Sequence, residues 1–421
     1  MAGPASTYDN GLHRAGWVLQ DPRTLIPNGY VRVLAGQIRE VGPWRQAASP
    51  AGREPVFDHG PGVLMPALVN AHTHLELSGF KDQLDCTRGF GPWVQALLQL
   101  RDQTAPAVLA AAAEMGVQEI VTTGTGTVCE ISSLGLTDQL LRRSGLSGFW
   151  AREILGNLEN PPDTALPDWS GVVKPALAGH APHTTAPALL TTLKQVDETY
   201  QRPFAIHVSE SEEEAEFISS SSGAWADFLT ERGIDFSDWG LPARSPVAYL
   251  EALGVLNVRT LAVHVLQADE HDLDLLQRRR TPVCVCPRSN QALHGRRPDI
   301  PAMLARRMTV CLGTDSLAST PSLDLFDEMA FIARHYPALD PSQILAMATA
   351  FGATALGQPA LGKLDRGCSS RMIYVPGPFA TRKELIETIV NKGFNQPCQP
   401  LFLQANPQTG EKDAGQALKP G

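Results

Sequence analysis

The chain has 421 residues, of which 43% are hydrophobic and 19% are charged, so it has room for one large globular domain and a smaller one. Its net charge of -9 argues against nucleic acid as a partner, and no apolar run approaches the roughly 20 residues of a membrane span. The N-terminus lacks the pattern of a secretion signal, and the seven cysteines lack the spacing of a disulfide framework, so we expect a cytoplasmic protein with reduced thiols.

The beginning and the end of the chain both predict short strands. Residues 30–34 and 37–42 alternate in polarity on either side of a glycine turn, which is typical of a hairpin. After residue 357, strand-like runs return at residues 362–364 and 371–375. We therefore expect residues 1–65 and 358–421 to form one small β domain.

The middle of the chain, residues 66–357, predicts a larger domain in which strands alternate with helices. We expect eight strands, at residues 63–70, 119–125, 149–155, 171–178, 204–207, 260–264, 282–286 and 308–313. Eight strands separated by helices predict a (β/α)8 barrel of the TIM type. An open doubly wound sheet is the alternative, but the chain shows no glycine-rich dinucleotide motif.

Polar side chains follow most of these strands. His72 and His74 end the first strand two residues apart, so both face one side and make half of a transition-metal site. The active site of a β/α barrel lies at the C-terminal ends of its strands, and later strand ends carry Glu153, His180, His183, His207, Glu210, His264, Asn290 and Asp315. The second strand has no obvious candidate. This recurrence predicts a metal-dependent enzyme.

These motifs resemble the amidohydrolase superfamily, in its branch of aminopurine and nucleoside deaminases. The resemblance spans roughly residues 25–375 and rests on PALVNAHTH at 66–74, HAPHT at 180–184, HVSES at 207–211, His264, PRSN at 287–290 and GTDS at 313–316. It implies an α/β fold in which the barrel carries a small β-sandwich built from both chain ends.

The resemblance also implies one divalent metal ion, usually zinc with iron as the alternative, held by His72, His74, His207 and Asp315. The metal would lower the pKa of a bound water. Asp315 would accept the proton of that water, Glu210 would carry it to a ring nitrogen of the substrate, and His264 would bind the adding oxygen. A two-metal site is disfavoured, because Lys174 precedes the fourth strand end by several residues.

For other residues the sequence allows more than one role or location. His180, His183, Arg152 and Asn290 are candidates for substrate binding, although His183 stands where relatives often have tyrosine and Asn290 suits a strand-end hydrogen bond equally well. Cys284 and Cys286 lack paired partners and are expected in the core. His271 and His294 lie in polar segments and are expected at the surface.

The resemblance implies a small-molecule substrate, with neither nucleic acid nor membrane as a partner, and it leaves a homo-oligomer open. The segment HTHLELS at 72–78 and the pair Ser316-Leu317 look most like the 6-aminodeoxyfutalosine deaminases of menaquinone biosynthesis. The carboxylate of that substrate would need a cation, for which Arg101, Arg152 and Arg288 are candidates. The alternatives are a deaminase of S-adenosylhomocysteine, methylthioadenosine or guanine, a hydrolase of cyclic amides or chloro-heterocycles, and a non-catalytic relative.

Overall fold

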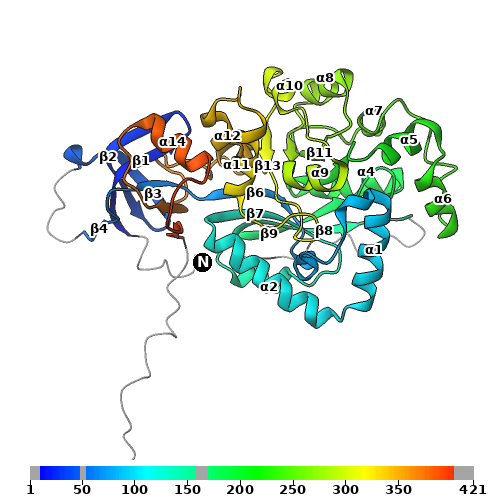
Figure 1. Ribbon diagram of the computed structural model, residues 1–421, viewed down its shortest axis with the longest axis horizontal. Coiled ribbons are helices and arrows are strands. Elements are labelled where there is room, and N and C mark those ends of the chain that lie inside the picture. The colour runs from blue at the N-terminus through cyan, green and yellow to red at the C-terminus, as the bar shows by residue number, and fades with distance from the viewer. Residues whose placement is uncertain (1–9, 48–53, 158–165, 167–168, 170, 403–421) are drawn as a thin grey trace, which may run out of the picture.

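The computed structural model describes residues 10–47, 54–157, 166, 169 and 171–402. Two sheets lie side by side, and helices surround the larger one (Figure 1). The termini assigned above to the small domain, residues 1–9 and 403–421, lie outside the described residues. Within the described residues, no helix combines the length and the apolar character that crossing a membrane requires.

The larger sheet has eight strands in sequence order, and each neighbouring pair is parallel. The strands are β6 (Leu68–Thr73), β7 (Thr125–Ser132), β8 (Ser147–Ile154), β9 (Val173–Gly179), β10 (Phe204–Val208), β11 (Thr260–His264), β12 (Val283–Val285) and β13 (Val310–Leu312). The chain after β13 hydrogen-bonds to the end of β6, where the amides of Thr314 and Asp315 donate to the carbonyl of His72. The sheet is therefore a barrel, as the sequence predicts.

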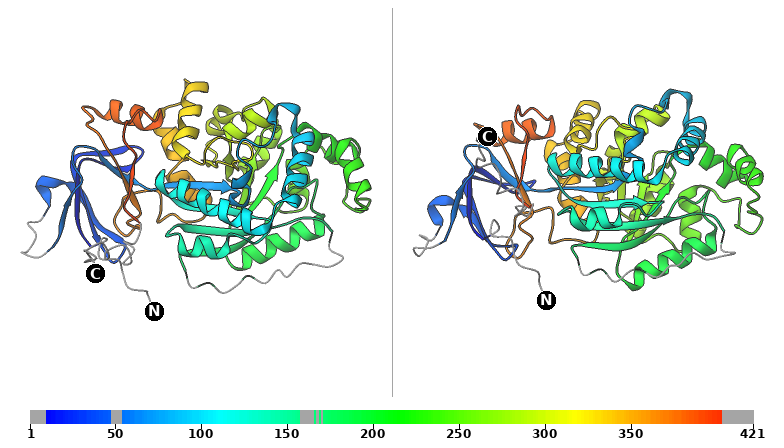
Figure 2. Two further views of the ribbon diagram at one scale, coloured as in Figure 1. Left: turned by 60° about the horizontal axis from the view of Figure 1, so that its bottom comes forward. Right: turned by 90° about the horizontal axis from the view of Figure 1, so that it is seen from below.

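Helices on the outside of the barrel connect its strands or follow the last of them (Figure 2). They are α1 (Phe90–Gln103), α2 (Pro106–Thr122), α3 (Asp138–Arg143), α4 (Pro187–Thr199), α5 (Glu212–Ser220), α6 (Ala224–Glu231), α7 (Pro246–Ala252), α8 (Glu270–Arg279), α9 (Pro287–His294), α10 (Ile300–Ala305), α11 (Leu325–His335), α12 (Pro341–Met347) and α13 (Ala350–Ala355). Side-chain caps start several of them, for example Asp269 at α8 and Asp324 at α11.

The smaller sheet joins the two ends of the chain. Its strands are β1 (Gly11–Asp21), β2 (Thr24–Leu34), β3 (Gln37–Pro43), β4 (Val56–Asp58), β5 (Val63–Pro66), β14 (Met372–Val375) and β15 (Gln399–Pro400). The pairing of β5 with β14 is antiparallel and links the N-terminal and C-terminal segments. The last helix, α14 (Arg382–Val390), packs on α11 and α12 of the barrel.

Three predicted strands differ from the structure. Residues 119–122 are the last turn of α2, because Ile120 continues the buried stripe of Leu109, Ala113 and Val117, and the strand begins only at Thr125. Residues 63–66 form β5 of the small sheet rather than the first barrel strand. Residues 362–364 are not a strand.

The barrel interior is closely packed at the level of the strands. Cys284 and Cys286 are both 0% exposed and pack with Cys129 and Cys311, which confirms the core position predicted for the first two. Gly313 is required at the closure, since a Cβ atom there would lie 2.8 Å from the Cβ atom of His72. The absence of a side chain lets the segment that carries Asp315 approach β6 closely.

Candidate metal centre and active site

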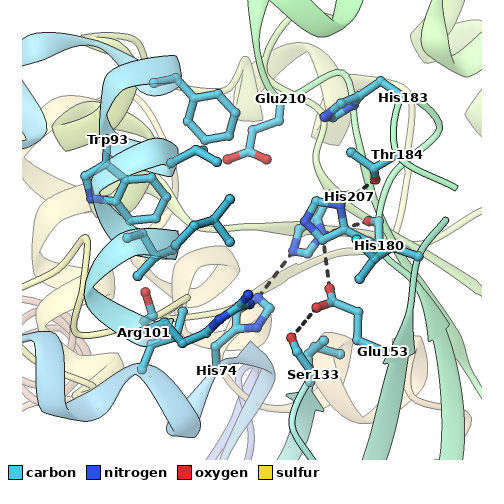
Figure 3. Close-up of a pocket in the computed structure, with 18 of the residues that line it drawn as sticks. His74, Trp93, Arg101, Ser133, Glu153, His180, His183, Thr184, His207 and Glu210 are labelled. Carbon is cyan, nitrogen blue, oxygen red and sulfur yellow. Dashed lines mark hydrogen bonds and ion pairs between the residues drawn. The ribbon is translucent and has the colours of Figure 1, made fainter. Parts of the chain in front are cut away.

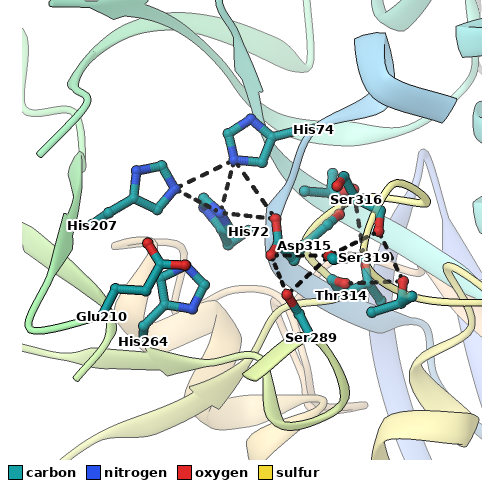
Figure 4. Close-up of polar contacts among 12 residues, drawn as sticks. His72, His74, His207, Glu210, His264, Ser289, Thr314, Asp315, Ser316 and Ser319 are labelled. Carbon is teal, nitrogen blue, oxygen red and sulfur yellow. Dashed lines mark hydrogen bonds and ion pairs between the residues drawn. The ribbon is translucent and has the colours of Figure 1, made fainter. Parts of the chain in front are cut away.

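Three imidazoles converge at the C-terminal end of the barrel (Figure 4). His72 lies near the end of β6, His74 follows that strand, and His207 lies on β10. Their Nε2 atoms are separated by 3.1 Å between His72 and His74, 3.2 Å between His72 and His207, and 3.3 Å between His74 and His207. Strand alternation brings the first two to one side, and the parallel barrel brings the third to the same end.

The chemistry of this cluster fits a divalent cation. Nδ1 of His207 donates to the carbonyl of His180 at 2.8 Å, so its Nε2 presents a lone pair to the other two rings. Burial, followed by the charges of the facing histidines, holds the pKa of His72 well below its usual 6.5, which favours a neutral imidazole at this position. Tetrahedral ligands about 2.0–2.1 Å from zinc lie roughly 3.3 Å apart, close to the spacing observed here.

Asp315 completes the cluster from the segment that closes the barrel. Its Oδ1 lies 3.9 Å from Nε2 of His74 and 4.0 Å from Nε2 of His72, and its Oδ2 accepts a hydrogen bond from Ser289. The backbone of Asp315 is left-handed, with φ of 59°, a conformation that costs a non-glycine residue about 1–3 kcal/mol. The barrel closure holds this conformation and directs the carboxylate toward the imidazoles.

Asn70, on the strand that carries His72, hydrogen-bonds to the segment that closes the barrel. Its Nδ2 donates to Oγ1 of Thr314 at 2.7 Å, and its Oδ1 accepts from the amide of Thr314 at 3.2 Å. Asn70 is 0% exposed, so these bonds form away from water. An asparagine within an apolar run, two residues before His72, was the available sequence signal for this positioning role, which was not predicted.

Glu210 and His264 form a second polar group next to the imidazole cluster (Figure 4). Oε1 of Glu210 lies 3.6 Å from Nε2 of His264, whose Nδ1 lies 3.1 Å from Nδ2 of Asn290. Burial raises the pKa of Glu210, but the nearby His264 and His294 outweigh it and lower the pKa below its usual value. Asn290 therefore lies behind His264, on helix α9 rather than at a strand end as predicted.

His180 and His183 lie on the β9 side of the cavity (Figure 3). Nδ1 of His180 lies 2.6 Å from Oγ1 of Thr184, and the ring centroids of His183 and Trp225 are 4.5 Å apart. Burial lowers the pKa of His180 to about 4 and that of His183 to about 3, so both rings are neutral at pH 7. Glu153 faces the same group, with Oε1 3.8 Å from Nδ1 of His207.

A cavity of about 300 Å³ opens above these groups. Its outer walls are largely apolar, with Phe90, Trp93, Val94, Leu97 and Leu98 from α1 and Trp225, Phe228 and Leu229 from α6. Arg101 extends from α1 into the same space, opposite His180 and His183 (Figure 3). Its ion-pair partner among the described residues is the exposed carboxylate of Asp102, at 3.4 Å. The cavity thus has a polar floor, an apolar sleeve and two arginines in its walls, Arg101 of α1 and Arg232 directly after α6.

Two predicted arginines lie elsewhere. Arg152 is exposed on β8 and does not line the cavity, because alternation along the strand turns it away from the side that Glu153 faces. Arg288 lies on α9, with its guanidinium 3.7 Å from the buried carboxylate of Glu328. Of the three arginine candidates, only Arg101 lines the cavity.

Two buried carboxylates near the site were not predicted from the sequence, and one histidine was predicted in the wrong place. Glu130, on β7, accepts a hydrogen bond from the amide of Leu75 at 3.0 Å, and Glu214 accepts one from the amide of Glu210 at 2.7 Å. Burial raises the pKa of Glu130 well above its usual value and that of Glu214 to about 8. An acid within an otherwise uncharged strand was the available signal for Glu130. His294 was expected at the surface but lies 3.5 Å from Glu210, with its side chain 7% exposed.

Proteins of known identity resemble this chain over most of its length. The 5-methylthioadenosine/S-adenosylhomocysteine deaminase of Syntrophobacter fumaroxidans is 30% identical over 384 residues, which cover 84% of this chain and 81% of the relative. The aminodeoxyfutalosine deaminase of Deinococcus radiodurans is 31% identical over 314 residues, which cover 70% of this chain and 73% of the relative.

Solved structures share the fold. The aminofutalosine deaminase of Helicobacter pylori in complex with methylthio-coformycin matches with a TM-score of 0.81 at 23% identity, over 92% of this chain and 97% of that chain. A zinc-bound adenosine deaminase from Xanthomonas campestris matches with a TM-score of 0.74 at 22% identity, over 94% of this chain and 90% of that chain. The sequence pattern of the amidohydrolase family matches residues 63–393, and the chain therefore belongs to that family of hydrolytic enzymes.

Proposed function

We propose that this protein is a hydrolytic deaminase of an adenosine-like nucleoside that works with one divalent cation, zinc in the first place and iron as the alternative. The observation that carries the proposal is the convergence on one cavity of two groups. One is the cation-binding cluster of His72, His74, His207 and Asp315, and the other is the proton-transfer pair Glu210 and His264.

A cation in the cluster would supply a Lewis acid that makes hydroxide available near neutral pH. The residues of the chain then have separate tasks. Asp315, with Oδ2 already hydrogen-bonded to Ser289, accepts the proton released from water. Glu210 takes up this proton and delivers it to the ring nitrogen next to the carbon under attack, which makes that carbon electrophilic. His264, fixed by Asn290, hydrogen-bonds the adding oxygen.

The reaction exchanges one bond for another at the amino-bearing carbon. A C–O bond forms as hydroxide adds, and the electron pair of the ring C=N bond moves to the nitrogen that Glu210 protonates. The exocyclic C–N bond then breaks as the added hydroxyl group gives its proton to Asp315 and becomes a carbonyl, Asp315 passes that proton to the departing amine, and ammonia leaves. Water is the only co-reactant, so no oxidant or reductant is required.

For the substrate we propose 6-aminodeoxyfutalosine, and hence a step of menaquinone biosynthesis. The apolar sleeve between α1 and α6 suits an aromatic substituent, and Arg101 provides a cation for the carboxylate that this substituent carries. The relative from Deinococcus radiodurans supports the same choice. Methylthioadenosine and S-adenosylhomocysteine are the second candidates, because the relative from Syntrophobacter fumaroxidans aligns over 84% of this chain.

The test is ammonia release by the zinc-loaded and the iron-loaded protein. The panel contains adenosine, methylthioadenosine, S-adenosylhomocysteine, guanine and 6-aminodeoxyfutalosine. We expect the highest kcat/KM for 6-aminodeoxyfutalosine. A higher value for either sulfur nucleoside would replace the proposed substrate, and chloride release from a chlorotriazine without any ammonia release from the panel would overturn the deaminase proposal.

Arg101 gives a sharper prediction on the same panel. Arg101→Gln should lower kcat/KM for 6-aminodeoxyfutalosine by about tenfold, because a charge-assisted hydrogen bond to the carboxylate is lost. Methylthioadenosine has no carboxylate, so it serves as the internal control and should be affected less than about twofold. Arg152→Gln is the matched protein control, since Arg152 does not line the cavity. Equal losses on both substrates for Arg101→Gln would remove Arg101 from carboxylate recognition.

A further inference from the structure

Helix α9 contacts Asp315, His264 and Glu210. These are the three residues to which the proposed reaction assigns proton transfer or binding of the adding oxygen. Oγ of Ser289 donates to Asp315, and Nδ2 of Asn290 lies 3.1 Å from Nδ1 of His264. The third contact comes from His294, whose Nε2 lies 3.5 Å from Oε1 of Glu210. Because residues four apart share one face of a helix, Asn290 and His294 point toward the site together.

The surroundings of His294 hold its ring in place. The side chain is 7% exposed, and its ring lies against Phe90 of α1, with ring centroids 4.8 Å apart. Phe90 in turn stacks on Trp93, which lines the cavity. Gly295 ends α9 directly after His294 with φ of 62°. The imidazole is therefore packed in a defined orientation between the apolar sleeve and Glu210.

The two oxygens of Glu210 have different environments. Oε1 lies between two imidazole nitrogens, 3.5 Å from Nε2 of His294 and 3.6 Å from Nε2 of His264. In the described part of the chain, no hydrogen bond reaches Oε2. Two ring nitrogens on one oxygen fix the rotation of the carboxyl group and leave the other oxygen for the substrate.

We propose that His294 is a positioning residue for Glu210. Its Nε2–H donates to Oε1 and, together with His264, holds the carboxyl group so that Oε2 faces the ring nitrogen of the substrate. The inference rests on the proposed function for the role of Glu210, but the contact between His294 and Glu210 can be measured without turnover. His294 thereby joins the packing of α1, which forms the sleeve, to the group that transfers the proton.

The test uses two variants of His294 in the metal-loaded protein. His294→Ala removes the donor and should lower kcat by about 10- to 100-fold, while KM and bound metal stay within about twofold of wild type. His294→Gln offers an amide N–H near the position of Nε2 and should restore kcat to within about threefold of wild type. His271→Ala, at an exposed position on α8, is the matched control and should keep full kcat.

Two kinetic outcomes would overturn the proposal. One is a His294→Ala protein with wild-type kcat. The other is equal loss of kcat in the alanine and glutamine variants together with equal loss of thermal stability, which would assign the residue to packing alone.

A second measurement separates this proposal from the proposed function. If wild type converts no compound on the panel, the proposed function fails, and ¹⁵N-histidine NMR then decides about His294. The Nε2 resonance of His294 is assigned by its absence from the His294→Gln spectrum. It should shift when Glu210→Gln replaces the carboxylate, and an unchanged resonance would overturn the contact.

Discussion

At the scale of single residues, the proposed site divides into groups that would hold a cation and groups that would move protons. His72, His74 and His207 present ring nitrogens to one another at hydrogen-bond distance, an arrangement that neutral imidazoles do not satisfy among themselves. Glu210 and His264 lie beside this cluster and face each other instead. Substitutions in the two groups should therefore have different consequences.

His207→Ala tests the cation-binding group. Removal of one of three imidazoles leaves an incomplete coordination set, so both bound metal and turnover should be lost. Metal content is measured by elemental analysis after dialysis against a weak chelator, with His271→Ala as the control. Stoichiometric metal in His207→Ala would exclude His207 from the ligands.

Glu210→Gln tests the proton-transfer group. The amide cannot deliver a proton to the substrate, so kcat should fall by about 100-fold to 10,000-fold while the metal content stays at the wild-type level. Elemental analysis and steady-state kinetics on the same preparation compare the two quantities. A rate within threefold of wild type would assign the proton transfer to another residue.

At the scale of elements, the segment between β10 and α5 depends on one buried carboxylate. Glu214 lies in the first turn of α5, and its two oxygens accept hydrogen bonds from the amides of Ser209 and Glu210 at 3.0 and 2.7 Å. Ser209 has a left-handed backbone, with φ of 52°, so the segment turns sharply between the proposed metal ligand His207 and Glu210. The side chain of Glu214 thus sets the place from which Glu210 reaches the cavity.

Glu214→Gln should weaken this turn. The amide group of glutamine keeps one acceptor and places an N–H against a backbone N–H, which costs about 1–3 kcal/mol of unfolding free energy. Urea unfolding should show this loss, and kcat should fall because Glu210 is less well placed. Glu212→Gln, on the exposed side of the same helix turn, is the matched control and should change stability by less than about 1 kcal/mol. Equal stability of the two variants would contradict this role for Glu214.

At the scale of the whole molecule, the small sheet is joined to the barrel by short, well-bonded connections. β5 passes through Ala67 directly into β6, and the amide of Ala67 donates to the carbonyl of Arg371 just before β14. Arg371 also donates to the carbonyl of Gly145 at 2.7 Å, at the start of the third barrel strand. Loss of the small sheet should therefore weaken the first barrel strand, which carries His72.

The small sheet contains a buried histidine, His13, that makes stability depend on pH. Nδ1 of His13 lies 3.1 Å from Nε2 of His59, and burial, followed by the charge of His59, lowers the pKa of His13 to about 4. Between pH 6.5 and 4 the unfolded chain binds this proton and the folded chain does not, so stability falls as the pH falls through this window.

His13→Phe isolates this effect from the protonation of the other histidines. The variant keeps a ring against Phe57 but has no group that titrates. Relative to wild type, its unfolding free energy should rise by about 2–3 kcal/mol as the pH falls from 6.5 to 4. Chemical unfolding at several pH values measures the difference, and a constant difference would contradict a neutral, buried His13.

The sequence by itself determined the barrel and the residues of the proposed cation cluster, because strand alternation and the strand-end rule act locally and place His72, His74, His207 and Asp315 at one end. The second strand, predicted at residues 119–125, was misplaced, since Ile120 and Val121 fit the buried face of a helix as well as a strand, and Glu130 was missed with it. Only the tertiary structure decided that Arg101 reaches the cavity, that Arg152 turns away and that His294 meets Glu210. These placements depend on how helices pack against the barrel, and that packing joins residues far apart in the chain.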